Sequence, residues 1–229
     1  MSKKKSAQHK QPPAANPQRL SLLLRERWHL ALPTAALLLM SIISYWPAYF
    51  AGFVWDDKVF LDAPPIVAMS GLADIWFTPG SLEFEGHYWP LVYTTFWLEH
   101  KLWGFNPTAF HIINVLLHGA VTLLIWRLLA RLSVPGAWLA AAIFAVHPVH
   151  VEAVAWVIAR KDLLAALFYL LAAGCWLRFK NEPKTGAYLL MLALFTAGML
   201  SKSFVITLPA NLLVWAWWKQ GRIAGKDLM

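Results

Sequence analysis

The sequence predicts an all-α, polytopic membrane protein with about six transmembrane helices and a long outer loop that carries interfacial helices. Hydrophobic residues make up 59% of its 229 residues and charged residues only 14%, whereas a soluble domain has roughly a quarter charged residues. Several apolar runs approach the roughly 20 residues with which a helix crosses a bilayer. We therefore expect membrane lipids to surround most of the chain.

The first 27 residues form a polar, basic segment ahead of the first apolar run. A lysine run at residues 3–5 and prolines at 12, 13 and 17 predict a disordered cytoplasmic tail over residues 1–27. The apolar stretch that follows is too long for a cleaved signal peptide, which favours a retained anchor. Residues 28–218 are then the transmembrane domain, and the basic stretch 219–229 is a second cytoplasmic tail.

Six apolar runs define the predicted spans. They cover approximately residues 30–52, 108–129, 136–147, 163–177, 187–200 and 204–218. Asn106 and Pro107 predict the cap and first turn of the second span. Whether the third span ends at Pro148 or continues to residue 158 stays open, because proline removes a helix hydrogen bond. Asn114 and His118, inside the second span, are expected to form hydrogen bonds between helices.

The outer loop, residues 53–106, is long, aromatic and acidic. Residues 64–77 predict an amphipathic interfacial helix. Residues 89–103 are apolar but contain Glu99, His100 and Lys101, which favours a second surface helix or a re-entrant segment. Tryptophans in this loop, such as Trp89, are typical of the aromatic belt at a membrane surface.

The distribution of basic residues predicts the orientation. With the N-terminus inside, 15 of the 20 Lys and Arg lie on inner segments, and the remaining five are Lys58, Lys101, Arg160, Lys161 and Lys202. This bias places both termini in the cytoplasm. The net charge of +8 is thus explained by topology and does not indicate nucleic acid. A single cysteine, Cys175, forbids an intramolecular disulfide, and we expect a multi-pass protein of the cell (inner) membrane.

Unusual polar residues gather on the predicted outer side. They include Asp56, Asp57, Glu83, Glu85, His87, Glu99, His100, His147, His150, Glu152, Arg160, Lys161, Asp162 and Lys202. Ionisable groups at membrane depth are typical of functional sites. Two adjacent acids such as Asp56 and Asp57 are either solvated loop residues or, at a water-filled site, a general base.

The segment His147 to Glu152 has some features of a metal site. His147 and His150 are three residues apart, and Glu152 offers an oxygen ligand. Pro148 disturbs that geometry, and no further ligand pair has a recognised spacing. We therefore expect no metal and no cofactor, and interpret these residues as structural or substrate-lining.

Three cations follow at the outer span ends. Arg160, Lys161 and Lys202, with Asp162, either contact lipid headgroups or converge on a phosphate or diphosphate. Such a site suits nucleophilic substitution at a sugar carbon. The donor would be a sugar on a lipid phosphate; a carboxylate would deprotonate the acceptor hydroxyl, and the cations would stabilise the departing phosphate.

Five sequence blocks resemble the transmembrane O-mannosyltransferase family whose members carry tetratricopeptide repeats, and its bacterial relatives. The blocks are FVWDD at 53–57, YWPL at 88–91, NPTAFHIINVLLH at 106–118, HPVHVEAVAWVIARKDLL at 147–164 and LSKSFVITLP at 200–209. The resemblance implies a GT-C type glycosyltransferase that transfers a sugar, such as mannose, from a polyprenyl-phosphate donor to a protein or glycan hydroxyl on the non-cytoplasmic face.

The resemblance also implies residue roles. Asp56 or Asp57 would be the catalytic base; the block at 147–162 and Lys202 would line the donor-phosphate pocket. Family members are longer, with further spans and a repeat array, so we expect an N-terminal membrane portion. Ser203 replaces a glutamate or proline common in relatives. A non-catalytic scaffold or sugar-lipid binding module is the alternative function, and a transporter is a third.

Overall fold

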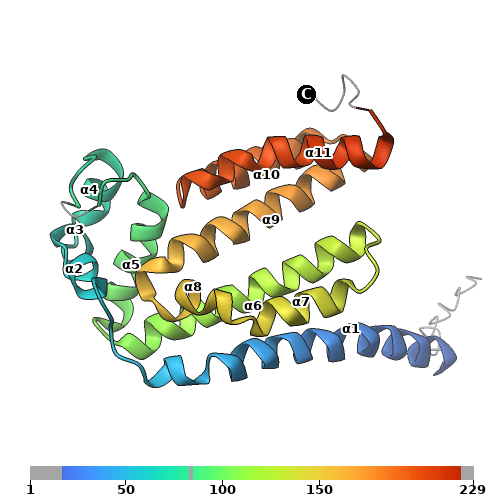
Figure 1. Ribbon diagram of the computed structural model, residues 1–229, viewed down its shortest axis with the longest axis horizontal. Helices are drawn as coiled ribbons and strands as arrows, with labels where there is room; N and C mark the ends of the chain where they lie inside the picture. The colour runs from blue at the N-terminus through green and yellow to red at the C-terminus, as the bar shows by residue number, and fades with distance from the viewer. Residues whose placement is uncertain (1–16, 83–84, 223–229) are drawn as a thin grey trace, which may run out of the picture. The chain divides into compact units, whose positions relative to one another are not determined.

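The computed structural model describes residues 17–82 and 85–222, and the regular structure in this part of the chain is entirely helical (Figure 1). The all-α prediction is confirmed. The α-helices are α1 (Pro17–Ser44), α2 (Asp57–Leu61), α3 (Pro64–Val67), α4 (Gly71–Phe77), α5 (Pro90–Trp103), α6 (Pro107–Arg131), α7 (Ala137–Val146), α8 (Val151–Ala155), α9 (Arg160–Asn181), α10 (Thr185–Met199) and α11 (Leu208–Gln220). The 3₁₀-helices are η1 (Trp46–Phe50), η2 (Pro148–His150), η3 (Val157–Ala159) and η4 (Ser203–Thr207).

The chain divides into two compact units, Met1–Ala36 and Leu37–Met229. The boundary falls inside α1, so the first unit contains only the amino-terminal part of that helix among the described elements. Residues 17–27, which the sequence assigned to the disordered tail, belong to α1. The rest of that predicted tail and residues 223–229 of the second tail lie outside the described residues. All contacts discussed below belong to the second unit.

Helices α6, α7, α9 and α10 form the packed helical bundle of the second unit. Helix α9 lies between α6 and α10, and α7 runs along α6 (Figure 1). Buried alanines lie where these helices pack: Ala141 and Ala142 of α7 cluster with Leu37, and Ala172 and Ala173 of α9 cluster with Leu208. Small residues let helix backbones approach closely, as helices in a membrane require.

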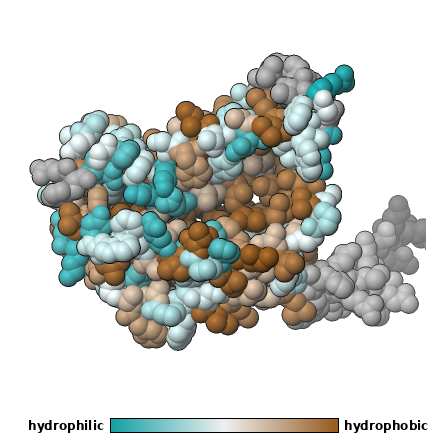
Figure 2. All heavy atoms as spheres, viewed as in Figure 1, coloured by the Kyte–Doolittle hydropathy of each residue, from teal (hydrophilic) through white to brown (hydrophobic). Residues whose placement is uncertain are grey.

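Apolar side chains cover the outside of this bundle. Only 33% of the most apolar part of α6 is buried. In the segment Val157–Asn181, 28% of the most apolar part is buried. Figure 2 shows hydrophobic side chains over the visible bundle surface and hydrophilic ones toward α2–α5. Helices that turn apolar residues outward are typical of proteins that lie in lipid, which supports a membrane location.

The number of membrane crossings stays a prediction. Among the described residues, two helical segments are long and apolar enough to cross a membrane, Pro107–Arg131 and Val157–Asn181. The bent pair Ala137–Val146 and Pro148–Ala155 is a third if it forms one span, and Leu30–Ser44 and Thr185–Met199 are shorter apolar helices. Six crossings were expected from the sequence.

The third apolar segment is not a continuous helix but is interrupted at Pro148, one of the two alternatives that the sequence left open. Helix α7 ends at Val146, and the segment from Pro148 continues at an angle of 54°. The imidazole Nδ1 of His147 accepts a hydrogen bond from the Val149 N–H at 3.2 Å, which fixes the new direction. Proline at this position lacks the N–H that a continuous helix would need.

Two polar residues of α6 hold the segments on the two sides of this break. Asn114 Nδ2 donates a hydrogen bond to the carbonyl of Val154 at 3.2 Å, and His118 Nε2 donates to that of Ala145 at 3.1 Å. The expected hydrogen bonds between helices are therefore confirmed. Asn106 is the N-cap of α6, with Pro107 in its first turn, but the Asn106 side chain forms no capping hydrogen bond.

The outer loop contains two short helices where the sequence predicted one. Helix α3 ends at Val67 and α4 begins at Gly71, so the single helix over residues 64–77 was wrong. The reason is a tight reversal: a Cβ at Gly71 would lie 1.9 Å from the Pro65 carbonyl oxygen. Both helices pack on α5, since Trp97 Nε1 donates to the Ala68 carbonyl at 2.9 Å and Trp76 Nε1 donates to Thr94 Oγ1 at 2.9 Å.

Candidate functional site

The adjacent acids Asp56 and Asp57 occupy different environments. The Asp57 side chain is completely buried. Its Oδ1 accepts a hydrogen bond from the Ile158 N–H at 3.0 Å, and its Oδ2 accepts one from the Val54 N–H at 3.0 Å. Burial raises the pKa of Asp57 above its usual range, although these N–H donors act in the opposite direction. Asp57 therefore links the outer loop to η3.

The carboxylate of Asp56, in contrast, is only partly engaged. The residue is half-buried, and its Oδ1 is shielded from solvent without a hydrogen-bond partner among the described residues. A buried oxygen without a partner is costly. It is also free to accept a hydrogen bond from a hydroxyl group that enters the site.

Tyr93 and Glu85 form a hydrogen-bonded pair, and the charge of Asp56 acts on the tyrosine. Tyr93, from α5, donates its hydroxyl hydrogen to Glu85 Oε2 at 2.6 Å. Burial raises the pKa of Tyr93, and the negative charges of Glu85 and Asp56 raise it further. The tyrosine hydroxyl thus remains protonated and serves as a hydrogen-bond donor.

Glu85 also contacts His87, whose ring stacks on Trp89. Its Oε1 accepts hydrogen bonds from the backbone N–H of His87 at 3.1 Å and from the Nδ1 of the same residue at 3.0 Å. The His87 ring stacks on Trp89, with ring centroids 4.6 Å apart and planes within 7°. The Lys161 ammonium lies 4.6 Å from the centre of the same indole, as a cation–π contact requires.

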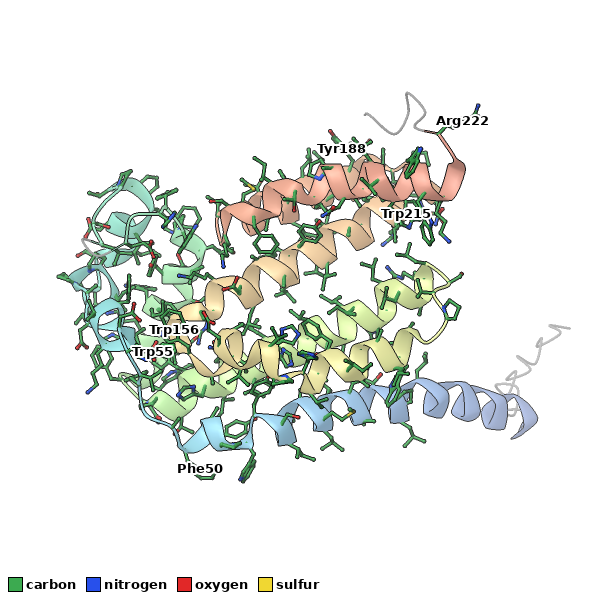
Figure 3. All side chains as sticks on the ribbon, viewed as in Figure 1. Phe50, Trp55, Trp156, Tyr188, Trp215 and Arg222 are labelled. Carbon is green, nitrogen blue, oxygen red and sulfur yellow. The ribbon has the colours of Figure 1, made fainter. Side chains whose placement is uncertain are left out.

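Two tryptophans, Trp156 and Trp55, connect Lys161 to the residue that precedes Asp56. Lys161 Nζ is 6.0 Å from the Trp156 ring, and Trp156 meets Trp55 edge to face at 5.1 Å (Figure 3). Trp55 precedes Asp56 and has a φ of 50°. A bulky residue in this left-handed region carries strain, which is frequent at functional sites.

Contacts link the side chains from Tyr93 to Trp55, and Asp56 follows Trp55 in the chain and acts on Tyr93 through its charge. We call this group the outer ring; its members are Trp55, Asp56, Glu85, His87, Trp89, Tyr93, Trp156 and Lys161. It combines a carboxylate with an unpartnered oxygen, a protonated phenol, an ammonium group and flat aromatic faces. Such groups suit a sugar attached to an anion.

Lys202 lies at the same end of α9 as Lys161. Its ammonium pairs with Asp162 Oδ1, and the two side chains are 31% and 38% exposed. A backbone hydrogen bond of 3.3 Å from the Leu91 N–H to the Leu200 carbonyl brings this segment against the start of α5. Two of the three predicted phosphate-binding cations are therefore near one another.

The third predicted cation, Arg160, is placed differently. Its side chain is completely buried and pairs through both Nη atoms with Glu99. Nε donates to Asn114 Oδ1 at 2.7 Å, and further bonds go to Thr95 Oγ1 at 3.2 Å and the Phe110 carbonyl at 3.1 Å. These acceptors use the five N–H groups of the guanidinium, so no N–H is left to bind a phosphate.

The predicted substrate-lining residues before α9 form their own group. His150 packs on Phe144 with ring centroids 4.1 Å apart, and on His147 at 6.1 Å. In residues 17–82 and 85–222 neither histidine forms a hydrogen bond or ring contact with the outer ring. Glu152 is exposed. Within the same residues, no three His, Cys, Asp or Glu side chains are grouped so that they could hold a metal ion.

Sequence reasoning gave no catalytic or binding role to several members of the outer ring. It placed Glu85 and His87 on the outer side without assigning a function, assigned Trp89 to the aromatic belt and did not single out Tyr93. Their common signal is a short stretch of the outer loop, residues 85–93, which contains one glutamate, one histidine and three aromatic residues.

Residues 87–227 match the protein family described as dolichyl-phosphate-mannose-protein mannosyltransferase. The chain is 35% identical to protein O-mannosyl-transferase Tmtc1 of Drosophila melanogaster, 32% identical to TMTC4 of Homo sapiens and 36% identical to Tmtc2 of Drosophila melanogaster. Each alignment covers 73% of this chain, and 21%, 27% and 20% of those relatives. No solved structure matches. The chain belongs to the dolichyl-phosphate-mannose-protein mannosyltransferase family.

Proposed function

We propose that this chain forms part of a membrane glycosyltransferase that transfers mannose from a polyprenyl-phosphate donor to a hydroxyl group of a protein. The description of its family names such a donor, a mannosyl group and a protein acceptor, and its relatives are protein O-mannosyl-transferases. The predicted orientation puts the reaction on the non-cytoplasmic face of the cell membrane.

The observation that carries this proposal is that Asp56 Oδ1, in the outer ring, has no hydrogen-bond partner among the described residues. Asp56 accepts the proton of the acceptor hydroxyl while the acceptor oxygen forms a bond to the anomeric carbon of the sugar. The bond between that carbon and the phosphate oxygen breaks, and its electron pair leaves with the lipid phosphate. Asp57 does not act as the base, because its two oxygens bind backbone N–H groups.

Two lysines supply positive charge for the leaving phosphate. Lys161 is held over the Trp89 face, and Lys202 lies close by through its pair with Asp162. Fixed cations stabilise the negative charge that develops on a departing phosphate. Arg160 acts as a positioning residue, because its buried contacts fix the start of α9 on which Lys161 and Asp162 lie.

Transfer of labelled mannose in membranes that contain the full chain tests this proposal. The donor is polyprenyl-phosphate mannose and the acceptor is a hydroxyl-bearing peptide. We expect Asp56→Asn to reduce transfer by about a hundredfold or more with membrane insertion unchanged. Asp62→Asn, at an exposed acid of the same loop, is the matched control and should retain full activity.

Two results would overturn the assignment. Undiminished transfer by Asp56→Asn would remove Asp56 from the reaction. Donor binding by the unmodified chain, with no mannose released to the peptide or to water, would favour the alternative, a non-catalytic module that binds sugar lipids. A donor-binding measurement on the same membranes distinguishes these results.

A further inference from the structure

A second polar site lies at the opposite end of α9 from the outer ring. It is a cleft of about 540 Å³ between the carboxyl ends of α6, α9 and α11, and Arg131, Ser133, Arg178, Glu182, Trp215 and Lys219 are among the residues that line it. Figure 3 shows Trp215 at this end and Trp156 at the other. Since α9 runs from Arg160 to Asn181, the two sites are about 30 Å apart at 1.5 Å per residue.

Positive charge dominates the cleft. The side chains of Arg131, Arg178 and Lys219 are exposed, and none of them forms an ion pair within the described part of the chain. Among the described residues of the lining the one carboxylate, Glu182, is paired with Lys184 at 2.8 Å. The lining therefore presents three cations against one neutralised acid, which favours an anionic ligand.

A tryptophan contributes a neutral donor. Trp215 Nε1 is shielded from solvent and lacks a hydrogen-bond partner within the described residues. Its ring is held edge to face against Trp176 at 5.3 Å, and Lys180 Nζ lies over both rings. Buried N–H groups are normally paired, so this indole N–H, beside arginine and lysine, is suited to an oxygen of a bound phosphate.

The position of the cleft indicates the source of that phosphate. Both apolar segments able to cross a membrane, Pro107–Arg131 and Val157–Asn181, end in its lining. The end of a span lies at the level of the lipid headgroups. Basic pockets between helices at this level are suited to anionic headgroups.

We propose that this cleft binds the phosphate headgroup of an anionic phospholipid. Arg131 and Arg178 contact the phosphate oxygens, Trp215 donates its indole N–H to them, and Lys219 adds charge at the rim. The site is separate from the outer ring, and the proposal does not depend on the transferase activity.

Native mass spectrometry of the full chain in detergent, titrated with phosphatidylglycerol or phosphatidylcholine, tests this assignment. We expect phosphatidylglycerol to be retained in preference to phosphatidylcholine. The double variant Arg131→Gln, Arg178→Gln should weaken phosphatidylglycerol retention about thirtyfold. Trp215→Phe, which keeps a ring but removes the N–H, should weaken it by a smaller factor.

The control variant removes the same charge from the same end of the molecule. Arg127 and Arg222 are exposed and do not line the cleft, so Arg127→Gln, Arg222→Gln should bind as the unmodified chain does. Equal losses of phosphatidylglycerol binding in the two double variants would overturn the proposal. They would show that binding depends only on net charge, or on cations that complement helix ends. Binding of inorganic phosphate that phosphatidylglycerol does not displace would overturn the assignment to lipid.

Discussion

Arg160 and Glu99 form a buried ion pair in which both guanidinium Nη atoms meet the two carboxylate oxygens. Asn114, Thr95 and the Phe110 carbonyl accept the remaining N–H groups, and the guanidinium lies 4.6 Å from the Phe96 ring. Arg160 thereby joins α5, α6 and α9 at one point. Its neighbour Lys161 lies over Trp89 instead, so adjacent cations serve separate purposes.

Glu99→Gln should destabilise the protein by about 3–5 kcal/mol, because the Arg160 charge would remain buried without its partner. The measurement is thermal unfolding in detergent, followed by tryptophan fluorescence. Glu182→Gln is the control, since its pair with Lys184 is largely exposed and should contribute less than about 1 kcal/mol. Equal unfolding temperatures for Glu99→Gln and the unmodified chain would contradict the described role of the pair.

Asp57→Asn should lower the free energy of unfolding by about 1–3 kcal/mol, because one of two backbone N–H groups then faces the amide NH₂ instead of an acceptor. The same substitution at Asp56, whose Oδ1 accepts no hydrogen bond from the described residues, should change stability less. Unfolding of the two variants in the same detergent makes the comparison. A larger loss in the Asp56 variant would reverse the structural assignment of the two acids.

The stability difference between the unmodified chain and Asp57→Asn should depend on pH. Burial raises the folded-state pKa of Asp57 above its ordinary value of 3.8, so the folded protein binds this proton more tightly than the unfolded chain. The stabilisation that comes from this tighter proton binding is full below pH 3.8. It is lost as the pH rises through the folded-state pKa of Asp57. Unfolding measured from acid to neutral pH should show a difference that shrinks as the pH rises; a growing difference would contradict the direction.

Gly71→Ala should disrupt the reversal between α3 and α4. The added Cβ would meet backbone atoms, with the Pro65 oxygen only 1.9 Å away, and backbone cannot move aside as a flexible side chain can. Limited proteolysis of the outer loop should therefore become faster. Gly86→Ala is the control in the same loop, because no described residue has an atom within 4 Å of its Cβ position. Equal cleavage of both variants would show that the reversal tolerates a methyl group.

Lys202→Gln should separate catalysis from stability. Its ion pair with Asp162 is about a third exposed on each side, so its loss should cost less than about 1 kcal/mol. If Lys202 stabilises the leaving phosphate, kcat/KM for mannose transfer should fall about tenfold to a hundredfold. Lys58→Gln, an exposed outer cation of α2, should leave kcat/KM unchanged, and a similar loss there would point to general electrostatic attraction of the donor.

The sequence predicted those features that depend on local pattern. The apolar runs and the helix start at Pro107 are such features, whereas Pro148 was only one of the two ends that the sequence left open for the third span. The hydrogen bonds of Asn114 and His118 were also expected, because polar groups within an apolar helix need partners.

Features that depend on distant contacts were not accessible from the sequence. Arg160 and Lys161 are adjacent and equally charged. Only the fold shows that Glu99, from another helix, forms an ion pair with Arg160. The same holds for Asp56 and Asp57, because only Asp57 accepts a hydrogen bond from the backbone N–H of Ile158. The reversal at Gly71 depends on a close approach to Pro65 that no periodic pattern contains.

The hydrogen bond from Ile158 to Asp57 joins residues 101 positions apart, and this separation has a consequence for biosynthesis. A chain emerging from the ribosome presents Asp57 long before its partner exists, at about 5–20 residues per second. During that interval the buried acceptor must remain hydrated, so the outer loop cannot reach its final packing until α6 and the broken third segment have followed it. The segment that carries Asp56 and Asp57 therefore reaches its final packing late, after the surrounding helices have been made.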